Sequence, residues 1–247
     1  MINAIGVIPA RFASTRFPGK VLADLCGKPL LQHVYEKAKE AKVLEDVIIA
    51  TDKEEIVKIA KGFGANVQYT SPDQPSGSDR VAEVVNPIDV KVVVNIQADE
   101  PLINAEMIDK LALALLEDEK IYAATLIKRI QGIEQILDPN TVKVVIDKDD
   151  FALYFSRSAI PYMREQSSGV IYFKHIGIYA FTKDFLFTYK NLPKTILETT
   201  EQLEQLRILE NGFKIKTIET EHDTVGVDTP QDLEKVKQIL IEKESKG

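Results

Sequence analysis

A basic segment that follows the first apolar run of the chain has the composition of a phosphate-binding loop. Residues 9–20 contain Arg11, Arg16 and Lys20, several small residues, the hydroxyl of Ser14 and no acidic side chain. Backbone N–H groups, hydroxyls and cations in one loop can together neutralise a triphosphate. The segment is not a Walker loop, because Gly-Lys-Ser/Thr is absent at the required spacing. The composition indicates phosphate binding, with an exposed basic surface loop as the alternative.

Two aspartates lie where carboxylates often bind a metal ion near phosphates. Asp99 comes after residues 92–96, the most strand-like run in the chain, and Asp228 stands directly before Thr229 and Pro230. Both carboxylates could hold a divalent cation. They could instead cap the helices that follow them, with Pro230 in a first helical turn. The two roles are compatible, because a carboxylate has two oxygens.

Polar residues in the second half of the chain have both a binding and a structural interpretation. Arg157 follows an apolar run, and it needs an anionic partner because an unpaired guanidinium is costly to bury. A substrate carboxylate and a structural salt bridge are both candidates for that partner. His175 alone indicates a hydrogen-bonded structural histidine, and Glu204 and Gln205 indicate the solvated face of a helix.

Apolar runs alternate with amphipathic ones along the first half of the chain. Strands that are apolar throughout and are separated by helices indicate an α/β fold, with a parallel sheet covered on both faces. Such a sheet usually places its ligand at the carboxyl ends of its strands. The second half is less regular and favours a mixed sheet. The expected strands are residues 5–8, 47–50, 67–69, 92–96, 123–129, 142–147, 152–155, 171–181 and 214–218, and the expected helices are residues 29–41, 53–63, 78–85, 105–116, 198–210 and 230–242.

Length, charge and cysteine content narrow the classes of protein. The 247 residues carry a formal net charge of −7, which argues against general binding to nucleic acid or to anionic membranes. No apolar run is long enough to span a membrane, and the single cysteine, Cys26, has no partner for an internal disulfide. Histidine and cysteine show no metal-ligand spacing. We therefore expect one domain over residues 1–247, located in the cytoplasm, whose second half could supply a sub-domain or a dimerisation arm.

A series of short stretches runs through almost the whole chain in an order and spacing typical of one family. They are Ile8-Pro9-Ala10-Arg11 through Pro18-Gly19-Lys20, Gly27-Lys28-Pro29, Ala50-Thr51-Asp52, Ser76-Gly77-Ser78-Asp79-Arg80, Asn95-Ile96-Gln97 with Asp99-Glu100-Pro101, Val142-Lys143-Val144-Val145, Ala152-Leu153-Tyr154-Phe155-Ser156-Arg157, Ile160-Pro161-Tyr162, Lys174-His175-Ile176-Gly177-Ile178-Tyr179, Leu203-Glu204-Gln205-Leu206-Arg207 and Gly226-Val227-Asp228-Thr229-Pro230. Together they resemble the family of 3-deoxy-manno-octulosonate (KDO) cytidylyltransferases.

The resemblance implies a fold, a reaction and a set of site residues. It implies a Rossmann-like nucleotidyltransferase fold, CTP as the donor, Mg²⁺ as the cofactor, a homodimer, and CMP-KDO as a product for lipopolysaccharide or capsule assembly. Arg11, Lys20, Asp99 and Asp228 would be the catalytic residues. By position, Ala10, Arg11, Ser14, Lys20, Ser76 and Gly77 would bind the nucleotide, Asp99 and Asp228 would bind magnesium, and Arg80, Gln97, Arg157, His175, Tyr179, Glu204 and Gln205 would surround the sugar acid.

The chain departs from the family pattern at Ala98, where the family usually has glycine before Asp-Glu-Pro. If the position requires positive φ, alanine would cost about 1 kcal/mol there. The added methyl group could also crowd a phosphate or the sugar. Two alternatives stay open: a cytidylyltransferase for another acidic sugar, such as 8-amino-KDO or a sialic acid, and a nucleotide-binding regulator that lacks catalysis. The presence of Lys20 and both aspartates argues against the regulator.

Overall fold

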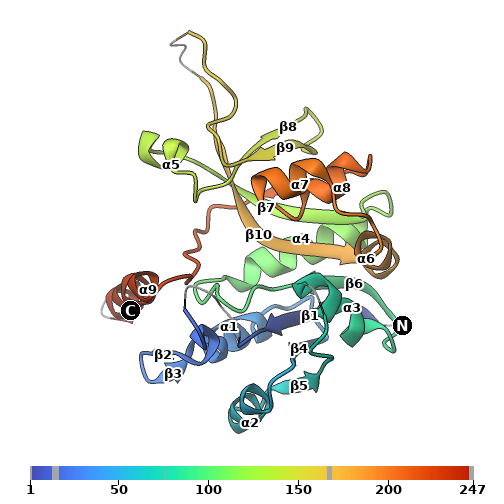
Figure 1. The fold of residues 1–247 in the computed structure, drawn as a ribbon, viewed down its shortest axis with the longest axis vertical. Helices are drawn as coiled ribbons and strands as arrows, with labels where there is room; N and C mark the ends of the chain where they lie inside the picture. The colour runs from blue at the N-terminus through green and yellow to red at the C-terminus, as the bar shows by residue number, and fades with distance from the viewer. Residues whose placement is uncertain (1, 13–16, 75, 166–168, 245–247) are drawn as a thin grey trace.

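The computed structural model describes residues 2–12, 17–74, 76–165 and 169–244. These residues form helices on both faces of a sheet, with a small two-stranded ribbon beside it (Figure 1). The elements in chain order are β1 (Ile2–Ala10), the 3₁₀ helix η1 (Lys20–Leu22), β2 (Asp24–Leu25), β3 (Lys28–Pro29), α1 (Leu30–Lys39), β4 (Asp46–Thr51), α2 (Glu54–Gly62), β5 (Asn66–Tyr69), α3 (Gly77–Val85), β6 (Val90–Asn95), α4 (Ala105–Glu117), β7 (Ala123–Arg129), α5 (Ile133–Leu137), β8 (Lys143–Ile146), β9 (Ala152–Ser156), β10 (Phe173–Thr182), α6 (Lys183–Lys190), α7 (Ile196–Glu201), α8 (Leu206–Glu210), β11 (Lys216–Glu219) and α9 (Pro230–Glu244).

The main sheet is mixed but mostly parallel. Its strands follow the order β11-β7-β10-β6-β1-β4-β5, and β8 and β9 extend it from β10. β1 pairs in parallel with β4 and β6, whereas β10 runs antiparallel between β6 and β7. The carboxyl ends of β1, β4 and β6 therefore meet at one edge, where residues 9–12 and 96–101 emerge. The prediction of an α/β fold with a mostly parallel mixed sheet is confirmed, whereas one domain over residues 1–247 stays a prediction.

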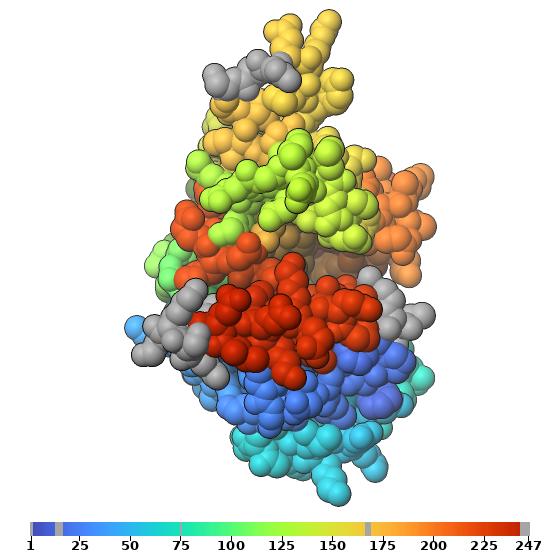
Figure 2. Space-filling view, turned by 90° about the vertical axis from the view of Figure 1, so that its left-hand side faces the viewer, coloured from blue at the N-terminus to red at the C-terminus, as the bar shows by residue number. Residues whose placement is uncertain are grey.

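Two hydrophobic clusters cover the two faces of the sheet. Side chains of α1, α4 and α9 pack on one face, and side chains of α3, α6 and α8 pack on the other. β1 is apolar throughout because it is buried on both faces, so its successive residues alternate between the two clusters. Figure 2 shows α9, in red, lying against the N-terminal half of the molecule. Among the described residues, no helix is both long enough and apolar enough to cross a bilayer.

One expected helix is wrong. Residues 198–210 form two short helices, α7 and α8, and not one continuous helix. The break begins at Gln202, whose φ of 55° lies in the left-handed region that ends a helix. As a result Glu204 and Gln205 lie between the helices, and Gln205 is only 7% exposed. The break could not be predicted, because the apolar residues of this segment keep a helical spacing. For the same reason Glu204 and Gln205 were expected on the solvated face of a helix.

The close packing around β1 generates a stability prediction. A Cβ atom on Gly6 would lie 2.9 Å from Leu44 Cδ1 and 3.0 Å from Ile96 Cδ1, so a side chain there has no room. We expect Gly6→Val to lower the free energy of unfolding by about 1–3 kcal/mol through overpacking. Urea unfolding followed by circular dichroism measures the change.

Gly62→Ala is the matched control, because a Cβ atom on Gly62 meets nothing within 4 Å. Alanine in this helix should leave stability unchanged or raise it by up to about 1 kcal/mol. Equal midpoints for Gly6→Val and the wild-type protein would contradict the packing described for β1.

Candidate active site

Three side chains from distant parts of the chain meet at the carboxyl edge of the sheet. The ammonium of Lys20 lies 2.6 Å from Asp99 Oδ2 and 2.9 Å from Asp228 Oδ1. Gly19 precedes Lys20 with φ 71°, a left-handed conformation that favours glycine and turns the chain into η1. We call Lys20, Asp99 and Asp228 the Lys20 site. It joins the three segments that the sequence marks for phosphate and metal chemistry.

The helices next to the two aspartates are capped by other residues. Asn104 Oδ1 accepts from the N–H of Glu106 at the start of α4, 2.8 Å away. At α9, Asp232 Oδ2 accepts from the Thr229 N–H at 2.9 Å, and the Asp232 N–H returns a bond to Thr229 Oγ1 at 3.2 Å. Thr229 therefore caps α9, in place of the neighbouring Asp228. The carboxylate of Asp228 contacts Lys20 instead.

Charge balance at the Lys20 site keeps the lysine protonated. Burial acts to lower the pKa of Lys20, but the charges and hydrogen bonds of Asp99 and Asp228 outweigh it, and the pKa is raised. The side chain of Lys20 is 12% exposed, against 29% for Asp99 and 48% for Asp228. The two carboxylates therefore remain accessible to a ligand from solvent. No cluster of three or more His, Cys, Asp or Glu residues suited to a metal occurs in the part of the chain that the structure describes.

Glu100 lies beside the Lys20 site and, unlike the carboxylates that pair with Lys20, has a strongly raised pKa. Its Oε2 atom is buried and has no hydrogen-bond partner among the described residues. Burial, and then the negative charge of Asp99, raises the pKa of Glu100 to about 8. A Cβ atom on Gly226 would lie 3.1 Å from Glu100 Oε1, so the absence of a side chain at Gly226 lets the C-terminal segment pass close to this carboxyl.

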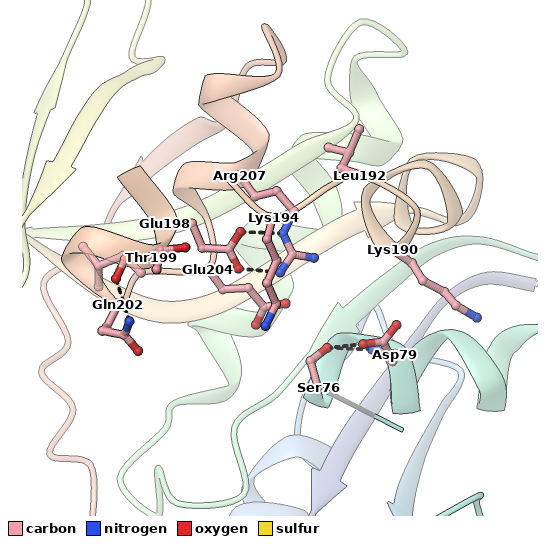
Figure 3. Close-up of a pocket in the computed structure, with 11 residues that line it drawn as sticks. Ser76, Asp79, Lys190, Leu192, Lys194, Glu198, Thr199, Gln202, Glu204 and Arg207 are labelled. Atoms are coloured by element: carbon pink, nitrogen blue, oxygen red, sulfur yellow. Dashed lines mark hydrogen bonds and ion pairs between the residues drawn. The ribbon is translucent and has the colours of Figure 1, made fainter. Parts of the chain in front are cut away.

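Two adjoining cavities open near the start of α3. The larger, of about 540 Å³, is lined by Ser76, which precedes α3, by Asp79 of α3 and, across from them, by Gln202, Glu204 and other residues of the α6–α8 region (Figure 3). The smaller, of about 50 Å³, shares Glu204 with it. The smaller cavity is lined by Ser78, Asn95, Gln97, Tyr179, Phe181, Tyr189, Glu204, Gln205 and Ile208. Of the residues predicted to surround the sugar, Gln97, Tyr179, Glu204 and Gln205 are thus together.

The smaller cavity contains polar atoms that lack partners. Asn95 Oδ1, Glu204 Oε1 and Gln205 Nε2 are buried and have no hydrogen-bond partner among the described residues. An unpaired buried polar atom costs about 1–3 kcal/mol, so three of them around one cavity indicate a site built for a polar ligand. Two acceptors and one donor match the donor and acceptor character of sugar hydroxyls.

His175 supports the smaller cavity from behind Tyr179. Its Nε2 lies 2.9 Å from the Tyr179 hydroxyl and 3.0 Å from Thr125 Oγ1. Burial lowers the pKa of His175 to about 3 and raises the pKa of Tyr179 well above its usual value, so both side chains are neutral at pH 7. The register between β10 and β7 shifts between Ile176 and Tyr179, next to this contact.

The predicted nucleotide residues lie around the end of β1 and the start of α3. Ala10 ends β1 and is fully buried, and a Cβ atom on Gly77 would contact Pro9 at 3.5 Å. The hydroxyl of Ser76 caps α3, accepting from the Asp79 N–H at 3.1 Å and donating to Asp79 Oδ2 at 2.6 Å. Arg11 donates to the carbonyl oxygen of Gln74 at 3.3 Å. Ser14 lies outside the described residues.

Arg80 is buried at 1% exposure and has an internal partner. Its Nη2 lies 3.4 Å from Asp52 Oδ2, and its Nη1 donates to Thr70 Oγ1. Burial and the charge of Arg80 lower the pKa of Arg11, so the two guanidiniums are near enough to repel each other. The geometry gives Arg80 a structural ion pair, and the negative charges of Asp52, Glu204 and Asp79 act on Arg11 in the opposite direction.

Arg157 lies apart from both cavities and is held by backbone groups. Its Nε donates to the carbonyl oxygen of Glu201 at 2.9 Å, and its Nη1 donates to that of Pro139 at 3.0 Å. Its own N–H donates to Glu201 Oε2 at 2.9 Å. The structure therefore gives Arg157 an acidic neighbour 44 positions away in the sequence. Among the described residues, its Nη2 atom has no hydrogen-bond partner.

The backbone at Ala98 removes one concern raised by the sequence. Among the described residues, the non-glycine positions with positive φ are Cys26, Asp150 and Gln202, so Ala98 is unstrained. Its methyl group is 6% exposed and belongs to the core on the α4 face. Alanine at this position therefore carries no backbone penalty.

Several residues of the site were missed from the sequence. Asn95 and Ser78 stand in recognised stretches but were given no role, and both line the smaller cavity. Tyr189 lines it from α6, a helix that the sequence reading did not include. Glu201, which binds Ser156 and Arg157, had no local signal because its partners lie more than 40 positions away.

The fold and the Lys20 site define an α/β protein of the nucleotidyltransferase class. The chain belongs to the cytidylyltransferase family, whose profile matches residues 5–218. The 3-deoxy-manno-octulosonate cytidylyltransferase of Solibacter usitatus is 52% identical and aligns over 96% of this chain and 94% of its own length. The enzyme of that name from Geobacter sulfurreducens is 47% identical over 97% of this chain and all of its own.

Solved structures agree with this assignment. The structure of CMP:2-keto-3-deoxy-manno-octonic acid synthetase complexed with CTP matches with a TM-score of 0.93 and 41% identity, over 98% of this chain and 99% of that one. A 4-diphosphocytidyl-2C-methyl-D-erythritol synthase from Anaerococcus prevotii shares the fold, with a TM-score of 0.63 and 17% identity over 96% of this chain and 98% of that one.

The buried carboxyl of Glu100 makes stability depend on pH. The folded protein keeps this proton up to about pH 8, whereas the unfolded chain releases it near the ordinary pKa of 4.5. Wild-type stability should therefore lose a contribution as pH rises from 4.5 to 8. Glu100→Gln removes the titration, so its free energy of unfolding relative to wild type should rise by about 1–3 kcal/mol between pH 5 and pH 8.

The measurement is urea unfolding of both proteins, without metal or nucleotide, at several pH values. Glu117→Gln, at an exposed position of α4, is the control and should keep the wild-type pH dependence. A constant difference between Glu100→Gln and wild type across this range would show that Glu100 is ionised in the folded protein.

Proposed function

We propose that this chain transfers CMP from CTP to the anomeric hydroxyl of KDO, giving CMP-KDO and pyrophosphate for lipopolysaccharide or capsule biosynthesis. The observation that carries the proposal is the meeting of Lys20, Asp99 and Asp228 at the carboxyl edge of the sheet. Relatives that match nearly the whole chain and are named for this reaction support the choice of CTP and KDO.

In this reaction the anomeric oxygen of KDO attacks the α-phosphorus of CTP. A new oxygen–phosphorus bond forms, the bond from the α-phosphorus to the bridging oxygen breaks, and pyrophosphate leaves with the electron pair. The hydroxyl proton is released to solvent. Both reactants are anionic, so positioning and charge neutralisation supply most of the catalysis. No covalent intermediate with Cys26 is required.

The basic segment after β1 would hold the donor. Arg11 and Lys20 offset the charge of the triphosphate and then of the departing pyrophosphate, and Ser14 contributes a hydroxyl. Ala10, Ser76 and Gly77 border the nucleotide, because the end of β1 and the first turn of α3 lie side by side. Burial and the nearby charge of Arg80 lower the pKa of Arg11 although Asp52, Glu204 and Asp79 oppose them, which supports binding of a phosphate there.

The acceptor sugar would use the smaller cavity and its surroundings. Gln97, Glu204 and Gln205 offer hydrogen bonds to sugar hydroxyls, as the unpaired atoms of the last two support. Tyr179 and His175 form the wall behind them as neutral groups. Arg157 would bind the sugar carboxylate through Nη2, because its Nε and Nη1 atoms donate to backbone carbonyls. Arg80 would contribute positive charge near the sugar while it stays paired with Asp52.

The donor set at the Lys20 site fits a magnesium ion. Asp99 and Asp228 direct hard oxygen ligands to one point and remain partly exposed. Two carboxylates suit Mg²⁺, which usually completes its coordination with water and substrate phosphates. When bound, the ion would polarise the α-phosphate and favour loss of the acceptor proton. Asp99 and Asp228 would hold it, while Lys20 would move from the carboxylates to the phosphates.

Two further expectations belong to this proposal. A homodimer is supported by the described residues between β9 and β10, 157–165 and 169–172, which project from the body (Figure 1) and expose Tyr162, Met163 and Ile171. A cytoplasmic location is supported by the requirement for CTP, a cytoplasmic metabolite. Neither nucleic acid nor a membrane is a partner in this proposal.

The test of the proposal is pyrophosphate release by the purified protein with CTP and Mg²⁺ and a panel of acid sugars. KDO should give the highest kcat/KM, and chelation of the metal should abolish release. A higher kcat/KM with 8-amino-KDO or a sialic acid would keep the cytidylyltransferase and change the sugar. Binding of CTP without pyrophosphate release for any sugar or metal would assign the chain to the regulator class.

The Lys20 site generates a prediction for its two aspartates. Asp99→Asn and Asp228→Asn each remove one negative charge from the metal site, so each should lower kcat by at least about a hundredfold. The fold should survive, because the side-chain shape is nearly unchanged. Steady-state pyrophosphate release measures kcat, and circular dichroism checks the fold.

Asp149→Asn, in the exposed turn between β8 and β9, is the matched control and should keep wild-type turnover. Near-normal turnover and magnesium dependence in Asp228→Asn would instead mean that Asp228 serves only the local structure before α9.

A further inference from the structure

Lys143 is a buried cation that the proposed reaction does not use directly. It lies in β8, is fully buried, and directs its ammonium to three backbone carbonyls. Its Nζ lies 2.8 Å from the oxygen of Asp138, 2.6 Å from that of Thr141 and 2.5 Å from that of Arg157. An ammonium has three protons to donate, and all three are used.

The three carbonyls belong to two segments that flank the paired strands β8 and β9. One segment, residues 138–142, connects α5 to β8 and lines a cavity of about 360 Å³ with Glu100 and Lys174. The other is Arg157, just after β9. Arg157 in turn donates through Nη1 to Pro139, in the same connecting segment. Lys143 and Arg157 thus both donate hydrogen bonds to backbone oxygens of residues 138–142, which have no regular secondary structure.

The position of Arg157 is fixed from both of its peptide groups. Its N–H is held by the Glu201 carboxylate at 2.9 Å, and its carbonyl is held by Lys143 at 2.5 Å. β8 and β9 pair so that Lys143 stands opposite Ser156, which brings the ammonium beside Arg157. Without Lys143 the carbonyl of Arg157 would lose its charged donor, and the direction of its guanidinium would become less defined.

Burial of this ammonium is costly. Desolvation lowers the pKa of Lys143, and it has no carboxylate in direct contact among the described residues. An apolar side chain of the same length would avoid the cost. A lysine here is better explained by the geometry that it imposes on Arg157 and residues 138–142 than by a gain in stability.

We propose that Lys143 is a positioning residue that sets the geometry of Arg157 and of residues 138–142 for binding the acid sugar. The inference rests on the proposed function, in which Arg157 binds the sugar carboxylate. Lys143 would affect binding of the sugar through Arg157. It would not affect binding of the nucleotide, because the residues proposed to bind the nucleotide lie on other elements.

The test compares Lys143→Met with the wild-type protein in steady-state pyrophosphate release with CTP, KDO and Mg²⁺. The KM for KDO should rise by about tenfold or more, while the KM for CTP should change by less than about twofold. Lys143→Gln keeps an amide donor and should give an intermediate KM for KDO. Lys148→Met removes an exposed lysine from the β8–β9 turn and should match the wild type.

A double-mutant cycle distinguishes positioning from a general structural effect. If Lys143 acts through Arg157, adding Lys143→Met to Arg157→Met should raise the KM for KDO by no more than about twofold further. Full additivity, an equal rise in both KM values, or failure of both Lys143 variants to fold would each overturn the inference. An inactive wild-type protein would overturn the proposed function itself, which the same assay reports separately.

Discussion

The ion pairs of Lys20 with Asp99 and Asp228 are the interaction on which the arrangement of the site depends. These carboxylates stand 79 and 208 positions from Lys20 in the sequence, yet both lie within 3 Å of one ammonium. Only a fold that brings the loop after β1, the end of β6 and the start of α9 to one edge can satisfy this constraint. Parallel pairing of β1 with β6 supplies the first two, and the contact of Val227 N–H with the Asp99 carbonyl, at 2.8 Å, fixes the third.

In the proposed function, the second half of the chain adds the acceptor side to this edge. β10 runs antiparallel beside β6 and sets Tyr179 opposite Asn95, so a cavity forms next to the carboxyl end of the sheet. Because the helix is interrupted between α7 and α8, the side chains of Glu204 and Gln205 line that cavity. Lys143, Arg157 and Glu201 then tie the β8–β9 extension to α7 by hydrogen bonds that use backbone groups. The proposed donor and acceptor regions thus lie on different halves of one sheet.

The sequence predicted the first half of the fold well because local patterns determine it. Buried strands are apolar throughout, and helices such as α4 carry an unbroken apolar stripe, so the predicted strands and helices of the first half match closely. Lys20 and Asp99 were predicted from their places after apparent strands, and Asp228 from its place before Thr229 and Pro230. Their mutual contact could not be predicted. Contacts between residues far apart in the sequence could not be predicted, such as the ion pair of Arg80 with Asp52 and the hydrogen bond of Arg157 with Glu201. The break at Gln202 was also missed, because a left-handed residue there interrupts a helical pattern.

In the proposed function, Lys20 occupies the point between two carboxylates that a divalent cation would use. In the absence of nucleotide the ammonium and the cation should therefore compete, because removing a positive charge strengthens the attraction of the site for another. The most direct measurement is Mn²⁺ binding to wild type and to Lys20→Met by electron paramagnetic resonance, with Asp228→Asn in the Lys20→Met background as control. Lys20→Met should bind Mn²⁺ at least about tenfold more tightly than wild type, and the control should lose this gain. Equal or weaker binding by Lys20→Met would rule out this competition.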